Sequence, residues 1–323
     1  MTGPGGPAPQ RPAPPPGLDP LTGQDPVHLG GHRLLGRISD TGNGVVYGAV
    51  DVNRRCAALR TLPTRDRVTL DRRVEALCLS AAVCAAPVHT VDLSGPVPWI
   101  AMEYVPGRDL DTHVRSFGPL EGAHLTGAAA GTAEALGALH TAGTVHGDLA
   151  PDRVLLSPRG PRVVGAGLAD ETLAAAGAAG WSAPETAHGG APGPGADVFS
   201  WACAVVLAAT GRGPFGRGTV QEIHERALHG RFDLRGVPEW MAPLVAKSLH
   251  PDPRARPGAH ALARALLPRG ATSALPEALG ALLAEHWRGF DAAGHDPVLW
   301  SMAPERATRR RPGRGIRWGR TGS

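Results

Sequence analysis

The chain changes character at the turn Pro106-Gly107, and this change limits the folds open to it more than any other feature. Before the turn, β-rich runs surround turns of small residues, with one helical pattern among them. The expected strands cover residues 32–38, 45–50, 56–60, 88–93 and 98–104, and the expected helix covers residues 70–84. After the turn the pattern is mostly helical, with long apolar helices predicted at 125–140 and 196–210. The sequence therefore predicts an α+β fold with a small β-rich lobe, a larger helical lobe and a cleft between them.

The two ends of the chain differ from the part between them. Residues 1–29 are rich in Pro and Gly and hold almost no large apolar side chains, so we expect them to be disordered. Near the other end, residues 276–290 place Leu279, Leu283 and Phe290 on one helical stripe. This stripe predicts a helix docked on the helical lobe, with Trp300 as a further anchor of the same extension. A helix that binds a separate partner is the alternative.

Positive charge is concentrated in the last residues. The formal net charge is +4, but residues 306–323 contain seven arginines and no acidic residue, which leaves about −3 for residues 1–305. We therefore do not expect the folded part to bind nucleic acid through a basic surface. Residues 306–323 predict a flexible, solvated tail. Contact of this tail with an anionic surface, such as nucleic acid or a membrane, is the functional alternative.

Cysteine spacing and hydropathy favour a cytoplasmic protein. Cys56, Cys78, Cys84 and Cys203 lack the paired spacing of a zinc site or a disulfide framework. The most apolar run, residues 201–209, is shorter than the roughly 20 residues that span a bilayer. No cationic start leads into an apolar run, so no secretory signal is visible. We expect no transmembrane segment.

A series of short motifs follows in order along the chain. They are residues 35–47, 57–60 and 102–105, the triplet His146-Gly147-Asp148, and residues 183–185, 197–200 and 252–257. In this order and spacing the chain resembles the Hanks-type serine/threonine protein kinases, especially those of actinobacteria. The resemblance covers residues 30–266 and implies a bilobal protein-kinase-like fold. We accordingly expect a small lobe at 30–105, a helical lobe at 106–266, a helical extension at 267–305 and a basic tail at 306–323.

The resemblance implies that the groups that shape the helical lobe are kept. Glu185 should pair with Arg256 inside that lobe, and Asp197 should accept backbone N–H bonds from the catalytic loop. Removing one partner of such a buried ion pair costs roughly 3–5 kcal/mol. These residues therefore predict a folded helical lobe, and they do not bear on turnover.

The groups that hold nucleotide phosphates in the family are largely replaced. The three glycine positions of the phosphate-covering turn read Ser39, Thr41 and Gly44, so only Gly44 remains. The phosphate-binding lysine is replaced by Arg60, whose planar fork changes the geometry. Drift in a chain that is poor in lysine is the alternative explanation. The glutamate that should pair with the lysine aligns to Arg73, and a closed arrangement would bring two cations together.

The usual metal ligands are replaced as well. The family binds Mg²⁺ through an Asn five residues after the catalytic Asp and through the Asp of an Asp-Phe-Gly triplet, and these positions hold Arg153 and Gly165. Mg²⁺ requires oxygen ligands, which an arginine side chain does not have. We therefore expect no Mg²⁺ at these positions. Asp152 and Asp170 are close in sequence but out of register, so we do not expect either to substitute.

The adenine side of the site is better kept. By the resemblance, Val46, Ala58 and Leu155 would enclose a purine, as they stand at the positions that do so in the family. Glu103 and Val105 would offer backbone atoms at the hinge, and Met102 would be the gatekeeper, so ATP binding is possible. We further hypothesise that Arg60 and Arg153 together replace the metal as counter-charge for phosphates. The alternative is an empty pocket that these two side chains fill.

Asp148 permits two functional classes. As a catalytic base it would accept a proton from a substrate hydroxyl in a weak or atypical serine/threonine kinase. As a turn residue held by loop hydrogen bonds it would be kept for architecture, and we favour this second role. The preferred class is then a pseudokinase that regulates other signalling proteins. His146-Gly147-Asp148 also resembles the small-molecule kinases that act on aminoglycosides and choline, but those lack the segment around Glu185 and its Arg256 partner.

Overall fold

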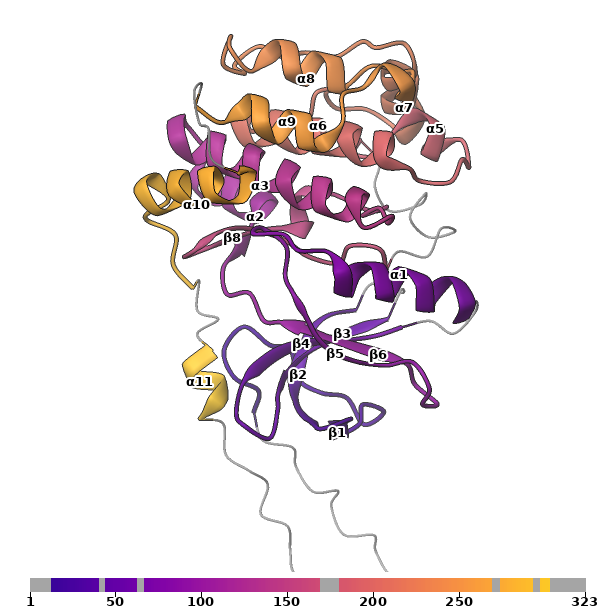
Figure 1. Cartoon of the computed structure of the whole chain (residues 1–323), viewed down its shortest axis with the longest axis vertical. Coiled ribbons are helices and arrows are strands. Elements are labelled where there is room, and N and C mark those ends of the chain that lie inside the picture. Colours follow the sequence, from indigo (N-terminus) through magenta and orange to yellow (C-terminus); the bar gives the residue numbers. More distant parts are fainter. Residues whose placement is uncertain are drawn as a thin grey trace, which may run out of the picture.

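The computed structural model describes residues 13–40, 44–62, 67–168, 180–268, 274–292 and 297–302. A small lobe holds a six-stranded antiparallel sheet in the order β1-β2-β3-β4-β6-β5. The strands are β1 His28–Leu29, β2 His32–Asp40, β3 Val45–Val50, β4 Cys56–Thr61, β5 Val88–Asp92 and β6 Trp99–Glu103. Helix α1, Arg67–Leu79, covers one part of the sheet (Figure 1) and buries Val74 against Leu62, Ile100 and Met102.

The second lobe is mainly helical and is built around α3 and α6. The helices are α2 Leu110–Phe117, α3 Gly122–Thr141, α5 Pro184–Ala187, α6 Pro194–Thr210, α7 Val220–Leu228, α8 Ala242–Ser248 and α9 Ala259–Leu266. Short 3₁₀ turns η1 Pro151–Arg153 and η2 Pro253–Ala255 lie between them, and a three-stranded sheet joins β7 Arg108–Asp109, β8 Val154–Ser157 and β9 Gly160–Val163. The small side chains of α3 let α6 approach closely, and the Trp201 indole N–H donates to the carbonyl of Ala129 at 2.9 Å. The predicted α+β, bilobal fold is confirmed.

The strands lie where the sequence placed them, but helix α1 ends earlier than predicted. The expected helix ran to residue 84, whereas α1 ends at Leu79. The chain then bends so that the backbone N–H groups of Val83 and Cys84 donate to the carboxylate of Glu134, at 2.9 and 3.0 Å. Glu134 is buried in α3, so these two hydrogen bonds satisfy a carboxylate that would otherwise lack partners. These hydrogen bonds between distant segments outweigh the local helical pattern.

The predicted disorder of residues 1–29 does not hold for residues 13–29, which pack along β2. Asp19 pairs with Arg37 through two backbone hydrogen bonds of 2.8 and 2.9 Å, and Leu18 is buried. The Asp25 carboxylate accepts hydrogen bonds from the Arg37 guanidinium and the Tyr47 hydroxyl. Burial alone would raise the pKa of Asp25, but these bonds hold it well below its usual range. These contacts thus order a segment whose composition predicts disorder. Residues 1–12 lie outside the described part of the chain.

The predicted helical extension divides between the two lobes. Helix α10, Leu275–His286, packs on α3 as expected. Helix α11, Pro297–Ser301, lies beside the strands of the small lobe (Figure 1), so Trp300 does not anchor the extension to the helical lobe. The reason is that the Trp300 indole packs with Leu18, Leu35, Val50 and Tyr104 of the small lobe and hinge. The predictions for residues 306–323 fall outside the described residues.

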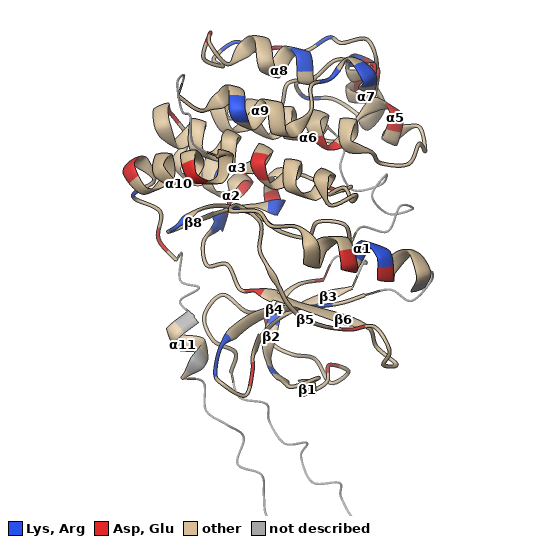
Figure 2. Ribbon diagram, in the orientation of Figure 1, with Lys and Arg blue, Asp and Glu red and all other residues tan. Residues whose placement is uncertain are grey.

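The distribution of charge and the lengths of the helices in the described residues agree with the expectations from the sequence. Acidic and basic residues are interspersed in both lobes (Figure 2). Within the described ranges, every helix is too short or too polar to pass through a bilayer.

Candidate functional site

A cavity of about 560 Å³ opens between the two lobes, a volume typical of small-molecule sites. Strands β3 and β4 supply its roof, β6 and the segment after it supply the back, and the catalytic-loop region supplies the floor. Most of the predicted nucleotide-site residues line it: Val46, Ala58, Arg60, Met102, Glu103, Val105, Arg153 and Leu155. The structure therefore brings these predicted residues together around one space.

Two arginines stand at one part of this cavity. The side chain of Arg60 projects from β4, is 8% exposed, and donates from Nη2 to the carbonyl oxygen of Leu168 at 3.3 Å. Burial and, to a smaller extent, repulsion from Arg153 lower the pKa of Arg60 to about 10, against the opposite effect of Asp148. Arg60 is thus still charged at neutral pH. This part of the cavity has the charge that an anionic ligand requires.

The guanidinium of Arg153 lies between two carboxylates. Its Nη2 atom is 3.5 Å from Oδ2 of Asp148, and its Nη1 atom is 2.8 Å from Oδ2 of Asp152. Asp152, the out-of-register carboxylate, therefore serves as a partner for an arginine. The side chain that stands at the family's Asn position neutralises the acidic groups of the catalytic loop. These residues do not fit a Mg²⁺ ion, because the ion would have to displace the Arg153 guanidinium from the two carboxylates.

Gly165 faces the same two arginines. Its φ is +79°, and a Cβ atom built on it would lie 3.5 Å from Cδ of Arg153 and 3.7 Å from Nη1 of Arg60. A side chain at this position would therefore point at the cationic part of the cavity. The family places a carboxylate at this position, and glycine contributes no negative charge to this part of the cavity.

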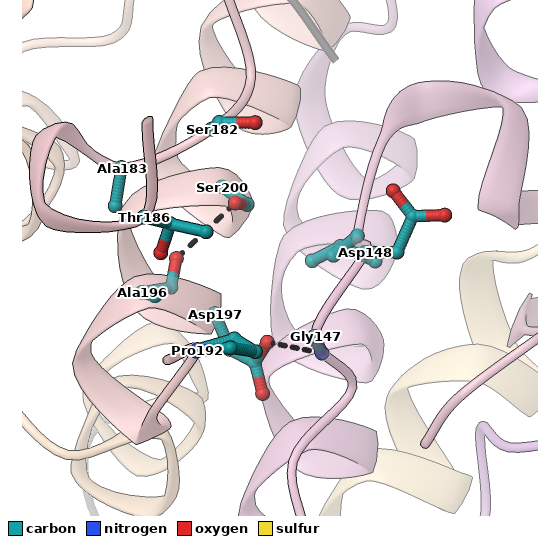
Figure 3. Close-up of a pocket in the computed structure, with 10 residues that line it drawn as sticks. Gly147, Asp148, Ser182, Ala183, Thr186, Pro192, Ala196, Asp197 and Ser200 are labelled. Atoms are coloured by element: carbon teal, nitrogen blue, oxygen red, sulfur yellow. Dashed lines mark hydrogen bonds between the residues drawn. The ribbon is translucent and has the colours of Figure 1, made fainter. Parts of the chain in front are cut away.

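The catalytic loop itself is firmly held. As predicted, Asp197, at the start of α6, accepts the backbone N–H of His146 at 2.8 Å. It also accepts the backbone N–H of Gly147 at 2.9 Å (Figure 3). The Asp148 carboxylate points away from Asp197 in this view (Figure 3). His146 is buried, and burial lowers its pKa, so the ring is neutral. Its Nδ1 accepts from the backbone N–H of Asp148 at 3.3 Å and its Nε2–H donates to Val164 at 3.1 Å.

The predicted ion pair of Glu185 and Arg256 is present. The two side chains form a bidentate pair with distances of 2.6 and 2.9 Å, and the Arg256 side chain is 0% exposed. The same guanidinium donates to the carbonyls of Gly195, His250 and Pro251. All its donors are used, so this pair fastens the end of the helical lobe to the start of α6.

Some predicted residues lie elsewhere. Gly44 is not among the residues that line the cavity; a Cβ there would be 2.0 Å from the carbonyl oxygen of Thr61, so its glycine is required by close packing on β4. Glu75 is exposed on α1, and Arg73 is half-buried. Thr41 and Asp170 lie outside the described residues. Asp148 lines a separate pocket of about 20 Å³ beside the Ala183-Pro184-Glu185 segment, and it meets the main cavity through Arg153.

Sequence reasoning did not assign four further residues to the cavity, one within the hinge and three after it. Tyr104, Arg108, Asp109 and Thr112 also line the cavity. The available signal was their position within and directly after the predicted hinge. Asp109 is fixed there as the cap of α2, because its side chain accepts the backbone N–H of Thr112 at 2.8 Å. Among the described residues, no group of three His, Cys, Asp or Glu side chains is placed to hold a metal ion.

Comparison with known families agrees with the geometry of the site and with the order of the motifs. A model of the protein kinase domain matches residues 43–266. The chain belongs to the protein kinase domain family. The structure of this kinase domain is similar to the crystal structure of Rad53 1-466 in complex with AMP-PNP, with a TM-score of 0.64 at 20% identity, covering 73% of this chain and 64% of that one. That likeness shows the fold.

Curated relatives of this kinase domain are bacterial serine/threonine-protein kinases. AfsK of Streptomyces coelicolor is 35% identical over 266 residues, which are 78% of this chain and 33% of AfsK. The probable kinase PkwA of Thermomonospora curvata is 32% identical over 254 residues, which are 74% of this chain and 34% of PkwA. The chain spans about a third of the length of these relatives. The predicted membership of the bacterial Hanks-type family is confirmed.

Proposed function

We propose that this kinase domain is a catalytically impaired serine/threonine pseudokinase that regulates other signalling proteins, and that its cleft binds ATP without a metal ion. The observation that carries the proposal is the position of Arg153 between Asp148 and Asp152. This ion pair occupies the carboxylate that would act as base. It also puts positive charge where phosphoryl transfer needs oxygen ligands for a divalent ion.

Each part of the nucleotide has a counterpart in the cavity. Val46, Ala58 and Leu155 offer apolar surface for the base, and the backbone of residues 103–105 offers hydrogen bonds at the hinge. Arg60 and Arg153 are the phosphate ligands. Arginine binds phosphate oxygens through paired N–H groups, so two arginines supply the counter-charge that a metal would otherwise provide. The bound AMP-PNP of Rad53 supports a nucleotide as ligand of this fold.

The alternative is a weak or atypical serine/threonine kinase with Asp148 as catalytic base. One observation favours it: the Arg153–Asp148 contact is 3.5 Å long, and the Asp148 side chain is 20% exposed. A substrate hydroxyl that displaced Arg153 would then meet a free carboxylate. The curated relatives are named as serine/threonine kinases, which supports the signalling role under either proposal. We propose the cytoplasm as its location.

Phosphoryl transfer distinguishes the two proposals. The full chain is incubated with γ-labelled ATP and Mg²⁺ or Mn²⁺, alone and with a generic protein substrate, beside Asp148→Asn. We expect equal, background labelling of both proteins, because Asp148 is engaged by Arg153 and the described residues offer no metal site to balance the phosphate charge. Labelling that exceeds background and falls to it in Asp148→Asn would establish the weak kinase instead.

A further inference from the structure

The chain after the helical lobe makes contact with both lobes and with the hinge between them. Its described parts are residues 274–292, which include α10, and residues 297–302, which include α11; four residues join them. In Figure 1, α10 lies against the helical lobe and α11 lies beside the sheet of the small lobe. Any change in the angle between the lobes must therefore be accommodated by this segment, which we call the strap.

The strap is strongly fixed to the helical lobe. Helix α10 buries Leu275, Leu279 and Leu283 against α3 and its neighbours. Trp287 is buried next to it, donates its indole N–H to the carbonyl of Ser157 at 2.8 Å and stacks on Phe290 with ring centroids 4.4 Å apart. This end of the strap is part of the lobe's hydrophobic core.

At the other end, the Trp300 side chain packs against the small lobe. Trp300 is 0% exposed and packs with Leu18, Leu35, Val50 and Tyr104. Gly48 makes room for it, since a Cβ there would lie 2.7 Å from the indole ring. The other apolar side chains of α11 and its end are exposed: Val298, Leu299 and Met302. Among the described side chains of α11, Trp300 is the buried one.

That attachment is weaker than its buried area suggests. Within the described part of the chain, neither the indole N–H of Trp300 nor the hydroxyl of Tyr104 has a hydrogen-bond partner, although both are buried. A buried polar group without a partner offsets part of the gain from apolar burial. The attachment at Trp300 is therefore weaker than the one at α10, where three leucines and Trp287 are buried.

Trp300 and the cleft share residues. The Tyr104 ring lies against the Trp300 ring with centroids 3.9 Å apart, and Tyr104 also lines the interlobe cavity. Ile38 and Ala58 likewise contact the Trp300 cluster and line the cavity. Further along the hinge, Asp291 of the strap pairs with Arg108 at 3.2 Å. The strap thus contacts the hinge region at two of its residues, Asp291 and Trp300.

We propose that residues 274–292 and 297–302 form an intramolecular strap whose Trp300 latch fixes the hinge and thereby the opening of the cleft. Docking of Trp300 positions Tyr104 and the roof strands, and its release frees the lobes to move about residues 104–108. Because coupling between two sites is reciprocal, whatever fills the cleft also changes how tightly Trp300 is held. This proposal requires neither nucleotide binding nor catalysis.

Hydrogen exchange of the full, ligand-free chain tests the latch. The variant is Trp300→Ala, and the matched control is Trp240→Ala, whose indole is 54% exposed on the helical lobe. We expect hinge amides of residues 103–109 to exchange about tenfold faster in Trp300→Ala, with α3 unchanged, because opening of the hinge becomes a local event. Trp300→Phe should restore most of the protection.

Two results would overturn the latch. Hinge exchange equal to that of the native chain would show that Trp300 does not act on the hinge, even if β2–β4 loosen. A uniform increase across both lobes, α3 included, would show that Trp300 is only a residue of the fold.

Discussion

The double variant Arg153→Asn and Gly165→Asp is expected to make ATP binding depend on Mg²⁺. The change removes the cation between Asp148 and Asp152 and puts two oxygen donors at the part of the cavity where Arg60 remains. Mg²⁺ then meets the hard ligands it requires. We expect ATP to bind at least about tenfold more tightly with Mg²⁺ than with EDTA in calorimetric titrations.

The variant is compatible with the backbone. A Cβ at residue 165 would make ordinary contacts of 3.5 and 3.7 Å, and Asp tolerates a positive φ better than most residues. Arg235→Asn, on an exposed arginine of the helical lobe, is the matched control and should leave the affinity ratio unchanged. Equal affinity of the double variant with and without Mg²⁺ would show that Arg153 and Gly165 do not decide metal use.

Replacing Arg256 by Met is expected to lower the free energy of unfolding by about 3–5 kcal/mol. The change leaves the Glu185 carboxylate without its bidentate partner and removes the donor for the carbonyls of Gly195, His250 and Pro251. The Arg256 side chain is fully buried and lies over the Phe199 ring, so water does not readily replace these bonds. Urea denaturation followed by circular dichroism measures the loss.

Two further variants show whether the charge pair is the cause. Arg254→Met, on an exposed neighbour in the chain, should change the free energy of unfolding by less than about 0.5 kcal/mol. Adding Glu185→Leu to Arg256→Met should recover part of the loss, because no unpaired carboxylate then remains. A cost in Arg256→Met as small as that in Arg254→Met would contradict a structural role for the pair.

Much of the fold and of the site could be predicted because it is encoded locally or in short motifs. Alternating apolar residues gave the strands around β3 and β4, and the motif order located Arg60, Leu155 and the Glu185–Arg256 pair. Each of these depends on residues within one element or at a recognisable spacing.

The differences come from contacts between segments far apart in the chain. Glu134 ends α1 by binding the backbone of Val83 and Cys84, about 50 residues away. Leu18 and Trp300 belong to one cluster on the small lobe, although Leu18 follows a Pro-rich run and Trp300 stands alone without periodicity. The contact of Arg153 with Asp152 was also out of reach, because sequence register predicts which position a residue holds and not which way its side chain turns.

The central claim is that arginines, and not a metal ion, balance the charge of a nucleotide in this cleft. Calorimetric titration of the native full chain with ATP, once in EDTA and once in excess Mg²⁺, tests it most directly. We predict saturable binding in EDTA that is at least as tight as in Mg²⁺, and loss of this binding in Arg60→Ala. Binding that occurs only in Mg²⁺, or no binding in EDTA, would contradict the claim.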